Sequence, residues 1–157
     1  MSQATEFSLS SPDATADLAA QLAVRLLPGD VVLLEGDIGT GKTHFARSLI
    51  QHLLPIPEDV PSPTFTLVQT YDTADFEIWH ADLYRLTSPD EVVELGLVDA
   101  FEDCLCLIEW PDRLADLTPE NALLLQFSLG PVEGSRTLRA SWSDPKWTAR
   151  LQGVSNG

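Results

Sequence analysis

The chain has 157 residues, enough for one domain (1–157) with a full hydrophobic core. Its 24 acidic residues against 9 basic ones give a net charge of −15, a poor surface for nucleic acid, which requires clustered lysine and arginine. No stretch approaches the roughly 20 apolar residues of a membrane span. Residues 1–11 lack the basic and apolar segments of a signal peptide, so we expect a cytoplasmic protein.

The first predicted elements are a strand, a helix and a buried strand. We expect a short strand at 6–10, then a helix start at Ser11-Pro12-Asp13, with serine as N-cap and proline at the first helical position. Pro28-Gly29 should end this helix. An apolar face is indicated by leucines four residues apart: Leu18, Leu22 and Leu26. Residues 31–34 read as a buried parallel strand.

The next segment has the G-x-x-x-x-G-K-[ST] spacing of a phosphate-binding P-loop. It reads Gly36-Asp37-Ile38-Gly39-Thr40-Gly41-Lys42-Thr43. Its glycines let backbone N–H groups approach phosphate oxygens, and the helix predicted from 43 to 54 points the positive end of its dipole at them. Lys42 can reach the phosphates and Thr43 can ligate Mg²⁺. A chance glycine-rich turn is the alternative, which the flanking strand and helix disfavour.

The remaining chain mixes helices with antiparallel hairpins. Four prolines at 55–63 predict a loop, followed by a hairpin of strands 65–71 and 76–82. A short helix at 88–95 and one helical turn at 98–102 precede a buried strand. That strand covers 105–109, and strands 122–129 and 137–142 suggest a second hairpin; residues after 143 are weakly specified. This order predicts an α/β, P-loop NTPase-like fold of three layers with a mixed, partly parallel sheet.

Two acids at strand ends are candidates for the chemistry of phosphoryl transfer, which requires a carboxylate near the metal ion. Glu109 ends the buried strand and is the candidate Mg²⁺ ligand. The alternative interpretation of Glu109 is an acid that lies at a strand end without a role in chemistry. Asp82 ends the second strand of the hairpin and is the other candidate acid. The alternative interpretation is that Asp82 only forms an ion pair with Arg85. Thr64 could place a hydroxyl near the γ-phosphate, as switch loops do, although a strand cap fits that position better when it is viewed alone.

Two aromatic neighbours and two cysteines suggest structural roles. His80 and Trp110 flank the acids and, taken singly, read as a core histidine and a packing aromatic. Cys104 and Cys106 face one side of a strand without metal-ligand spacing, so we interpret them as small buried hydrophobes.

Four segments together point to a known family. They are the P-loop, Ser62-Pro63-Thr64-Phe65-Thr66-Leu67, His80-Ala81-Asp82-Leu83-Tyr84-Arg85-Leu86 and Glu109-Trp110-Pro111. In this order and spacing, from Ser11 to Pro111, they resemble the bacterial TsaE (YjeE) family. After Pro111 only the length and the hairpin-like ending are similar.

The resemblance implies an ATPase that acts with TsaD and TsaB in making threonylcarbamoyladenosine at position 37 of certain tRNAs, with ATP and Mg²⁺ as cofactors. TsaD would transfer the threonylcarbamoyl group, and ATP hydrolysis by this chain would keep the system turning over. An acidic surface fits a subunit that docks on protein and leaves tRNA to others, although solubility or an acid-biased proteome explains the charge equally well.

The resemblance also implies roles for matching residues. Lys42 would be the phosphate lysine, Thr43 and Glu109 the Mg²⁺ ligands, Thr64 a switch-like residue and Asp82 a water-positioning or second-shell acid. Trp110 would lie near the site or the partner surface. The adenine side would include Ser11 and Arg136. The loop differs from the common family sequence at three positions: Ile38, Thr40 and His44. Because His44 directly follows the Mg²⁺ threonine, the family pattern does not determine the surroundings of the phosphates at this position.

Three other classes of function remain as alternatives. A P-loop small-molecule kinase would require an arginine-rich lid, but the seven arginines are scattered. A regulatory GTPase is disfavoured because the sequence has neither an N-K-x-D motif nor a D-x-x-G switch. A non-enzymatic scaffold that keeps the nucleotide as a structural ligand would use the same residues, so sequence does not separate it from an ATPase.

Overall fold

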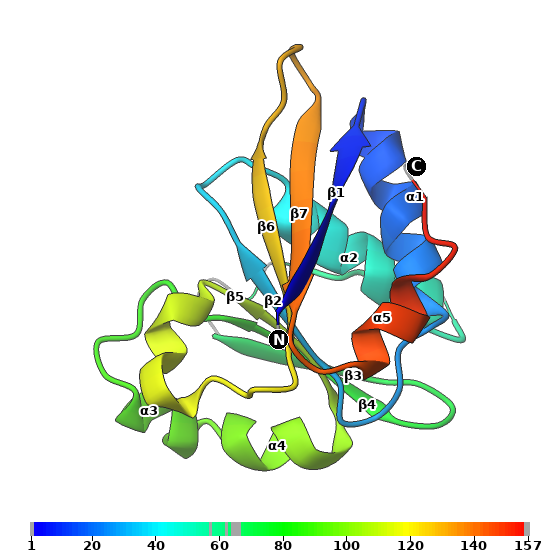
Figure 1. The fold of residues 1–157 in the computed structure, drawn as a ribbon. Coiled ribbons are helices and arrows are strands. Elements are labelled where there is room, and N and C mark those ends of the chain that lie inside the picture. Colours follow the sequence, from blue (N-terminus) through cyan, green and yellow to red (C-terminus); the bar gives the residue numbers. More distant parts are fainter. Residues whose placement is uncertain (1, 57, 62, 64–66, 156–157) are drawn as a thin grey trace.

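One mixed β-sheet organises the structure, a computed structural model that describes residues 2–56, 58–61, 63 and 67–155. The strands lie in the order β1-β7-β6-β2-β5-β4-β3 (Figure 1). They are β1 Gln3–Leu9, β2 Val31–Glu35, β3 Val68–Asp72, β4 Glu77–Asp82, β5 Leu105–Glu109, β6 Leu123–Leu129 and β7 Arg136–Trp142. The helices are α1 Pro12–Ala23, α2 Lys42–Leu53, α3 Asp90–Glu94, α4 Leu97–Asp103, the 3₁₀ helix η1 Pro111–Leu117 and α5 Lys146–Leu151.

The centre of the sheet is parallel and its edges are antiparallel. Strand β2 runs parallel to both β5 and β6, and β4 runs parallel to β5. The pairs β3–β4, β6–β7 and β1–β7 are antiparallel. The predicted mixed sheet with two hairpins is therefore confirmed.

Helices cover both faces of this sheet, which gives the predicted three layers (Figure 1). One apolar core lies under α1, α2 and α5, and the other lies under α3, α4 and η1. Strand β5 contributes to both cores because alternate residues of a strand point to opposite faces. Leu105 and Leu107 face α2, whereas Cys106 and Ile108 face α4. No helix among the described residues is long and apolar enough to cross a bilayer.

The start of α1 is the one predicted from sequence. Ser11 is extended, and its Oγ accepts a hydrogen bond from the Ala14 N–H at 3.2 Å. The helix ends at Ala23, before the predicted Pro28-Gly29 stop, so Leu26 is buried without being helical. A turn that starts at Val24 closes this end, and Asp30 fixes it by accepting a hydrogen bond from the Leu27 N–H at 2.7 Å.

Several elements depart from the sequence prediction because tertiary partners define them. Strand β1 begins at Gln3 rather than Glu6, since its backbone pairs with β7 as far as Trp142. Helix α4 spans seven residues rather than one turn, and η1 was not predicted. Strand β3 begins at Val68; residues 65 and 66 of the predicted strand lie outside the described residues.

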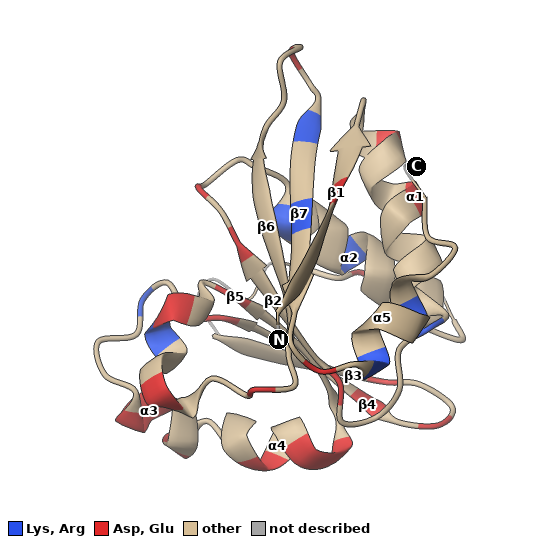
Figure 2. Ribbon diagram, viewed as in Figure 1, with Lys and Arg blue, Asp and Glu red and all other residues tan. Residues whose placement is uncertain are grey.

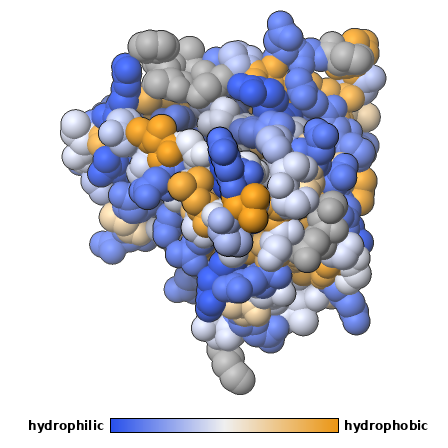
Figure 3. Space-filling view, turned by 90° about the horizontal axis from the view of Figure 1, so that it is seen from above, coloured by the Kyte–Doolittle hydropathy of each residue, from blue (hydrophilic) through white to orange (hydrophobic). Residues whose placement is uncertain are grey.

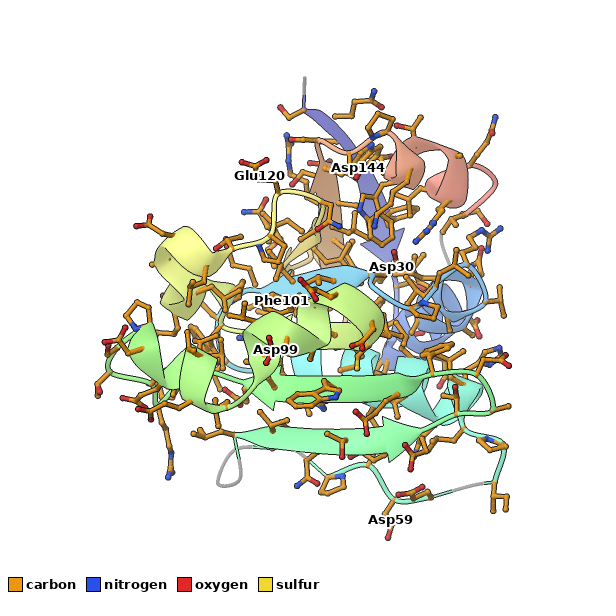
Figure 4. All side chains as sticks on the ribbon, turned by 90° about the horizontal axis from the view of Figure 1, so that it is seen from below. Asp30, Asp59, Asp99, Phe101, Glu120 and Asp144 are labelled. Atoms are coloured by element: carbon orange, nitrogen blue, oxygen red, sulfur yellow. The ribbon has the colours of Figure 1, made fainter. Side chains whose placement is uncertain are left out.

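Helix α5 lies in the weakly specified end of the sequence and is anchored by a buried ion cluster. The Asp30 carboxylate, 2% exposed, accepts from Lys146 Nζ at 3.0 Å and also contacts Arg150 Nη1 (Figure 4 labels Asp30). Between those two cations, the indole of Trp147 is fully buried and donates to the Asn121 carbonyl at 2.7 Å. The two contacts of Asp30 join residues more than 100 positions apart, which local sequence cannot signal.

The ion cluster predicts a large loss of stability when its carboxylate is removed. Asp30→Ala leaves two partly buried cations without their counter-charge, so we expect the free energy of unfolding to fall by about 3 kcal/mol in urea denaturation. Glu6→Ala is the control, because Glu6 meets Arg139 in an exposed pair at 3.8 Å, which should contribute less than about 1 kcal/mol. Equal stability of the two variants would contradict the anchoring role of Asp30.

Candidate nucleotide-binding site

The P-loop predicted from sequence lies between β2 and α2, which confirms its strand-loop-helix context. Gly39 and Gly41 have left-handed backbones with φ of +85° and +101°, and a Cβ at either position would meet no atom within 4 Å. Gly36 is different, because its Cβ would lie 2.6 Å from the Phe127 carbonyl oxygen. The loop therefore packs closely on β6 at its first glycine and is open at the other two.

This open side of the loop faces a cavity of about 550 Å³, which is within the usual range for small-molecule sites. Its walls come from the P-loop and the start of α2, the start of α1, the chain after β4 and β5, and the β6–β7 hairpin. Residues that line it and that the sequence singled out are Ile38, Gly39, Gly41, Lys42, Thr43, His44, Asp82, Glu109, Trp110 and Arg136.

Thr43 and Glu109, the two predicted Mg²⁺ ligands, line the cavity and contact each other. The Thr43 hydroxyl donates a hydrogen bond to Glu109 Oε1 at 2.9 Å. The second oxygen, Oε2, lies 2.7 Å from Nε2 of His80. Glu109 is 2% exposed and His80 is fully buried, so this carboxylate is held between two side chains away from bulk water.

Lys42 has two partners within the protein. Its Nζ donates to the Gly36 carbonyl at 2.5 Å and lies 3.6 Å from the centre of the Trp110 ring. Burial lowers the pKa of the Lys42 ammonium, and the charges of Glu109 and Asp82 oppose that effect only in part. Trp110 has a left-handed backbone, φ 59°, and its ring contacts that of Tyr84 at 4.8 Å between centroids.

Asp82 lies beside Glu109 because the two residues are register partners on the parallel strands β4 and β5. The Asp82 carboxylate is buried, and its Oδ1 accepts a hydrogen bond from the Tyr84 N–H at 3.0 Å. Burial raises the pKa of the Asp82 carboxyl; the bond from Tyr84 offsets the rise only in part, and the charge of Glu109 adds to it. A buried acid with a shifted pKa beside a cavity is a typical candidate for a group that positions water.

Other predicted site residues hold the loop in place. Arg136 on β7 donates to the Thr40 and Gly39 carbonyls at 3.2 and 3.1 Å. The Thr40 hydroxyl donates to the Asp37 carbonyl at 2.7 Å, and both of these loop residues precede the lysine. His44 Nε2 lies 2.9 Å from the Pro12 carbonyl, so it joins the start of α2 to α1.

The remaining predictions have different outcomes. Ser11 caps α1, and its neighbours Pro12 and Thr15 are the α1 residues that line the cavity. Ile38 is 77% exposed at the rim. Thr64 and Ser62 lie outside the described residues, so a switch-like role for Thr64 stays a prediction.

Sequence reasoning missed two features of the site. Tyr84 and Arg85 line the cavity, and the signal for them was the segment 80–86, in which they follow Asp82 by two and three residues. His80 is the buried core histidine that was predicted, but its contact with Glu109 joins positions 29 residues apart and has no local signal.

The geometry fits a nucleoside triphosphate with a divalent cation. At Gly39 and Gly41 a Cβ would occupy space that is open in this structure, so glycine at these positions leaves room for a ligand beside the backbone. The N-terminus of α2 adds positive potential there. Among the described residues, no group of three or more His, Cys, Asp or Glu side chains could hold a metal ion. A hydroxyl and one carboxylate suit Mg²⁺, which completes its shell with phosphate oxygens and water.

A P-loop between a parallel strand and a helix, with its threonine on a strand-end glutamate, defines an α/β protein of the P-loop class. The family model described as "Threonylcarbamoyl adenosine biosynthesis protein TsaE" matches residues 9–137. The chain belongs to the TsaE family, as its four motifs indicated.

Individual relatives agree with this assignment. A Rickettsia felis protein named tRNA threonylcarbamoyladenosine biosynthesis protein TsaE is 48% identical over 131 residues, which make up 83% of this chain and 75% of the relative. The Bacillus subtilis protein of that name is 37% identical over 114 residues, 72% of this chain and 70% of the relative. The crystal structure of Bacillus subtilis YdiB has the same fold, with a TM-score of 0.79, 24% identity and coverage of 98% and 95%.

The raised pKa of Asp82 predicts that this residue destabilises the ligand-free fold at neutral pH. When folding raises the pKa of an acid, burying the acid does not lower the free energy of unfolding below the unfolded pKa of about 3.8, where the group is protonated in both states. Above the folded pKa the full loss of stability applies. Asp82→Asn keeps the acceptor for the Tyr84 N–H and removes the charge. We expect the melting temperature of the variant to exceed that of the parent by about 1 to 3 °C at pH 7.

Thermal melts of both proteins without nucleotide from pH 4 to pH 7.5 measure this difference. It should shrink as the pH falls towards 4. Asp99→Asn on the exposed part of α4 is the control and should show no such pH-dependent gain. A difference that stays constant with pH, or an Asp82→Asn variant that melts below its parent at neutral pH, would contradict the assigned cost of burying the charge.

Proposed function

We propose that this chain binds ATP with Mg²⁺ and hydrolyses it, acting in the cytoplasm with TsaD and TsaB in the threonylcarbamoyl modification of adenosine 37 of tRNA. Family membership supports the tRNA pathway, because the relatives are named for threonylcarbamoyladenosine biosynthesis. The comparisons support this hypothesis and give the kinase alternative no support.

The hydrogen bond of 2.9 Å between Thr43 and Glu109 carries the ATPase part of the proposal. It brings the last residue of the P-loop to the acid at the end of a parallel strand, which is where P-loop enzymes hold their metal ion. Mg²⁺ bound there would neutralise charge on the phosphate oxygens. Thr43 and Glu109 would hold it, Lys42 would contact the phosphates, and Asp82 would orient the attacking water.

Positive charge in this site comes from very few groups. Lys42 is one of only two lysines in the chain, and Lys146 lies in the ion cluster of α5. Figure 2 shows acidic residues on α3 and α4 and only scattered basic residues along the ribbon. Lys42, Arg85 and Arg136 are the basic side chains that line the cavity, and with the loop amides and the metal ion they would provide the local field for an anionic nucleotide.

The surface supports a protein partner better than direct contact with tRNA. Seen from above, hydrophobic residues interrupt a mostly hydrophilic face (Figure 3). Exposed apolar side chains occur on the P-loop and on the β6–β7 hairpin: Ile38, Leu129 and Val132. Exposed apolar residues on an acidic protein suit docking on another protein. Binding of the phosphate backbone of tRNA would instead require clustered cations.

Loss of the phosphate lysine should mainly weaken binding, and loss of the acid should mainly slow hydrolysis. For Lys42→Ala we expect ATP affinity to fall about 10-fold or more, since a charge-assisted bond to phosphate is removed. For Glu109→Gln we expect the hydrolysis rate to fall about 100-fold, with affinity in EDTA unchanged and the gain in affinity caused by Mg²⁺ reduced, because Glu109 is a proposed ligand of the ion. Calorimetric titration with an ATP analogue and a phosphate-release assay measure the two effects.

Matched controls exist for both variants. Lys146→Ala removes the other lysine, and Glu102→Gln neutralises an exposed acid on α4. Neither should change ATP affinity or turnover, although Lys146→Ala should lower stability through Asp30. Normal hydrolysis by Glu109→Gln would show that the proposed role of this acid is wrong.

The partner part of the proposal predicts slow hydrolysis by the isolated chain and faster turnover with TsaD and TsaB. Reconstituted modification of tRNA with both partners should run for more cycles when the wild-type chain and ATP are added. Glu109→Gln should fail to support those cycles while still binding the partners. Modification that is equally sustained without this chain would contradict the accessory role, whereas phosphorylation of a small alcohol or acid by the chain alone would favour a kinase.

A further inference from the structure

His80 is a fully buried polar residue with a contact that fixes one oxygen of the catalytic candidate Glu109. Its Nε2 lies 2.7 Å from Glu109 Oε2, and both side chains are almost completely removed from solvent. The other ring nitrogen, Nδ1, is buried without a hydrogen-bond partner in the described part of the chain. A buried histidine that has a single polar contact and an unpaired nitrogen requires an explanation beyond packing.

The sheet places this histidine beside the site. Along β4, Ile78, His80 and Asp82 share the face towards α2, because strand side chains alternate. Asp82 is the register partner of Glu109, and His80 is the partner of Leu107, one inward-facing pair earlier. The imidazole therefore approaches the Glu109 carboxylate from inside the core, on the side away from the cavity.

The chemistry of the contact sets the direction of the hydrogen bond. A carboxylate oxygen only accepts, so the proton of this bond sits on Nε2 of His80. The neutral tautomer with that proton leaves a bare lone pair on Nδ1, which is tolerated in a buried site better than an unpaired N–H. The observed pattern of one satisfied and one unpaired nitrogen matches this tautomer.

The two oxygens of Glu109 consequently have different partners. Oε1 accepts from the Thr43 hydroxyl at the edge of the cavity, and Oε2 accepts from His80 in the core. If the threonine oxygen were recruited to a cation, its bond to Oε1 would be lost, while the bond from His80 could remain. Without His80, the carboxylate could turn about its own axis and Oε2 would be buried without a donor.

We propose that His80 is a positioning residue that holds Glu109 Oε2 in the core, so that Oε1 stays directed at Thr43 and the cavity. This inference rests on the proposed function for the part that concerns the cation. It extends that function by assigning the orientation of the acid to a residue that does not touch the nucleotide. Partners of this kind behind metal ligands typically contribute 10- to 100-fold in metal affinity or activity.

The test compares the effect of Mg²⁺ on nucleotide affinity. The affinity of the full chain for a non-hydrolysable ATP analogue is measured by calorimetry with Mg²⁺ and again with EDTA. For His80→Leu we expect the gain in affinity caused by Mg²⁺ to fall by about 10-fold or more, with binding in EDTA within about two-fold of the parent. His80→Gln can place an amide donor near the position of Nε2 and should recover most of the gain.

A control variant separates positioning from general loosening of the strand. Ile78 lies two residues earlier on the same face of β4, is equally buried, and is the register partner of Leu105, four residues before Glu109, so Ile78→Ala is the control. It should lower stability but keep the gain from Mg²⁺. An equal loss of that gain in Ile78→Ala, or a failure of His80→Gln to exceed His80→Leu, would overturn the positioning role.

A second readout does not involve nucleotide or metal. Nitrogen-15 NMR of the histidine side chains in the ligand-free protein should show His80 as the neutral tautomer with its proton on Nε2; His80→Gln identifies that signal among the three histidines. The opposite tautomer would overturn the inference by itself. A wild-type chain whose affinity is the same in Mg²⁺ and EDTA would instead overturn the proposed function, and the cation role of His80 with it.

Discussion

The level alignment of three parallel strands is the constraint on which the site depends. Glu109 is the register partner of both Leu34 on β2 and Asp82 on β4, so the three strands end side by side. Backbone bonds continue this alignment beyond the strands, from Leu83 N–H to the Glu109 carbonyl at 3.1 Å and from Trp110 N–H to the Leu34 carbonyl at 3.3 Å. A slip of one residue would turn the acid to the opposite face, away from Thr43.

The same alignment buries charge in a place where a core would otherwise be apolar. Four polar side chains at the strand ends and the start of α2 are each at most 8% exposed: Lys42, His80, Asp82 and Glu109. The pKa of Lys42 is lowered and that of Asp82 is raised, which means that both charged forms lose solvation. The surrounding leucine-rich strands must therefore offset a local cost, and this is common where a fold places groups for chemistry rather than for stability.

Sequence predicts the parts of this arrangement that are local and misses the parts that only the sheet creates. The P-loop and the Ser11 cap were readable because their residue types must adopt special backbones or terminate a helix within a few positions. Whether Asp82 lay on the right face could not be read from one strand, because that depends on its parallel pairing with β5. Helix α5 could not be predicted from the local sequence for the same reason, because the residue that anchors it, Asp30, precedes it by more than 100 residues.

Lys42 and Arg136 contact different parts of the P-loop. Arg136 fixes the carbonyls of Gly39 and Thr40, so the shape of the loop does not depend on the lysine. The lysine instead rests on the Gly36 carbonyl and on the ring of Trp110. The Nζ has three N–H donors and gives one of them to Gly36, so donors remain for an anionic ligand without loss of that bond. Trp110 in turn packs on Tyr84, which is 47% exposed, so two rings in contact connect Lys42 to the protein surface.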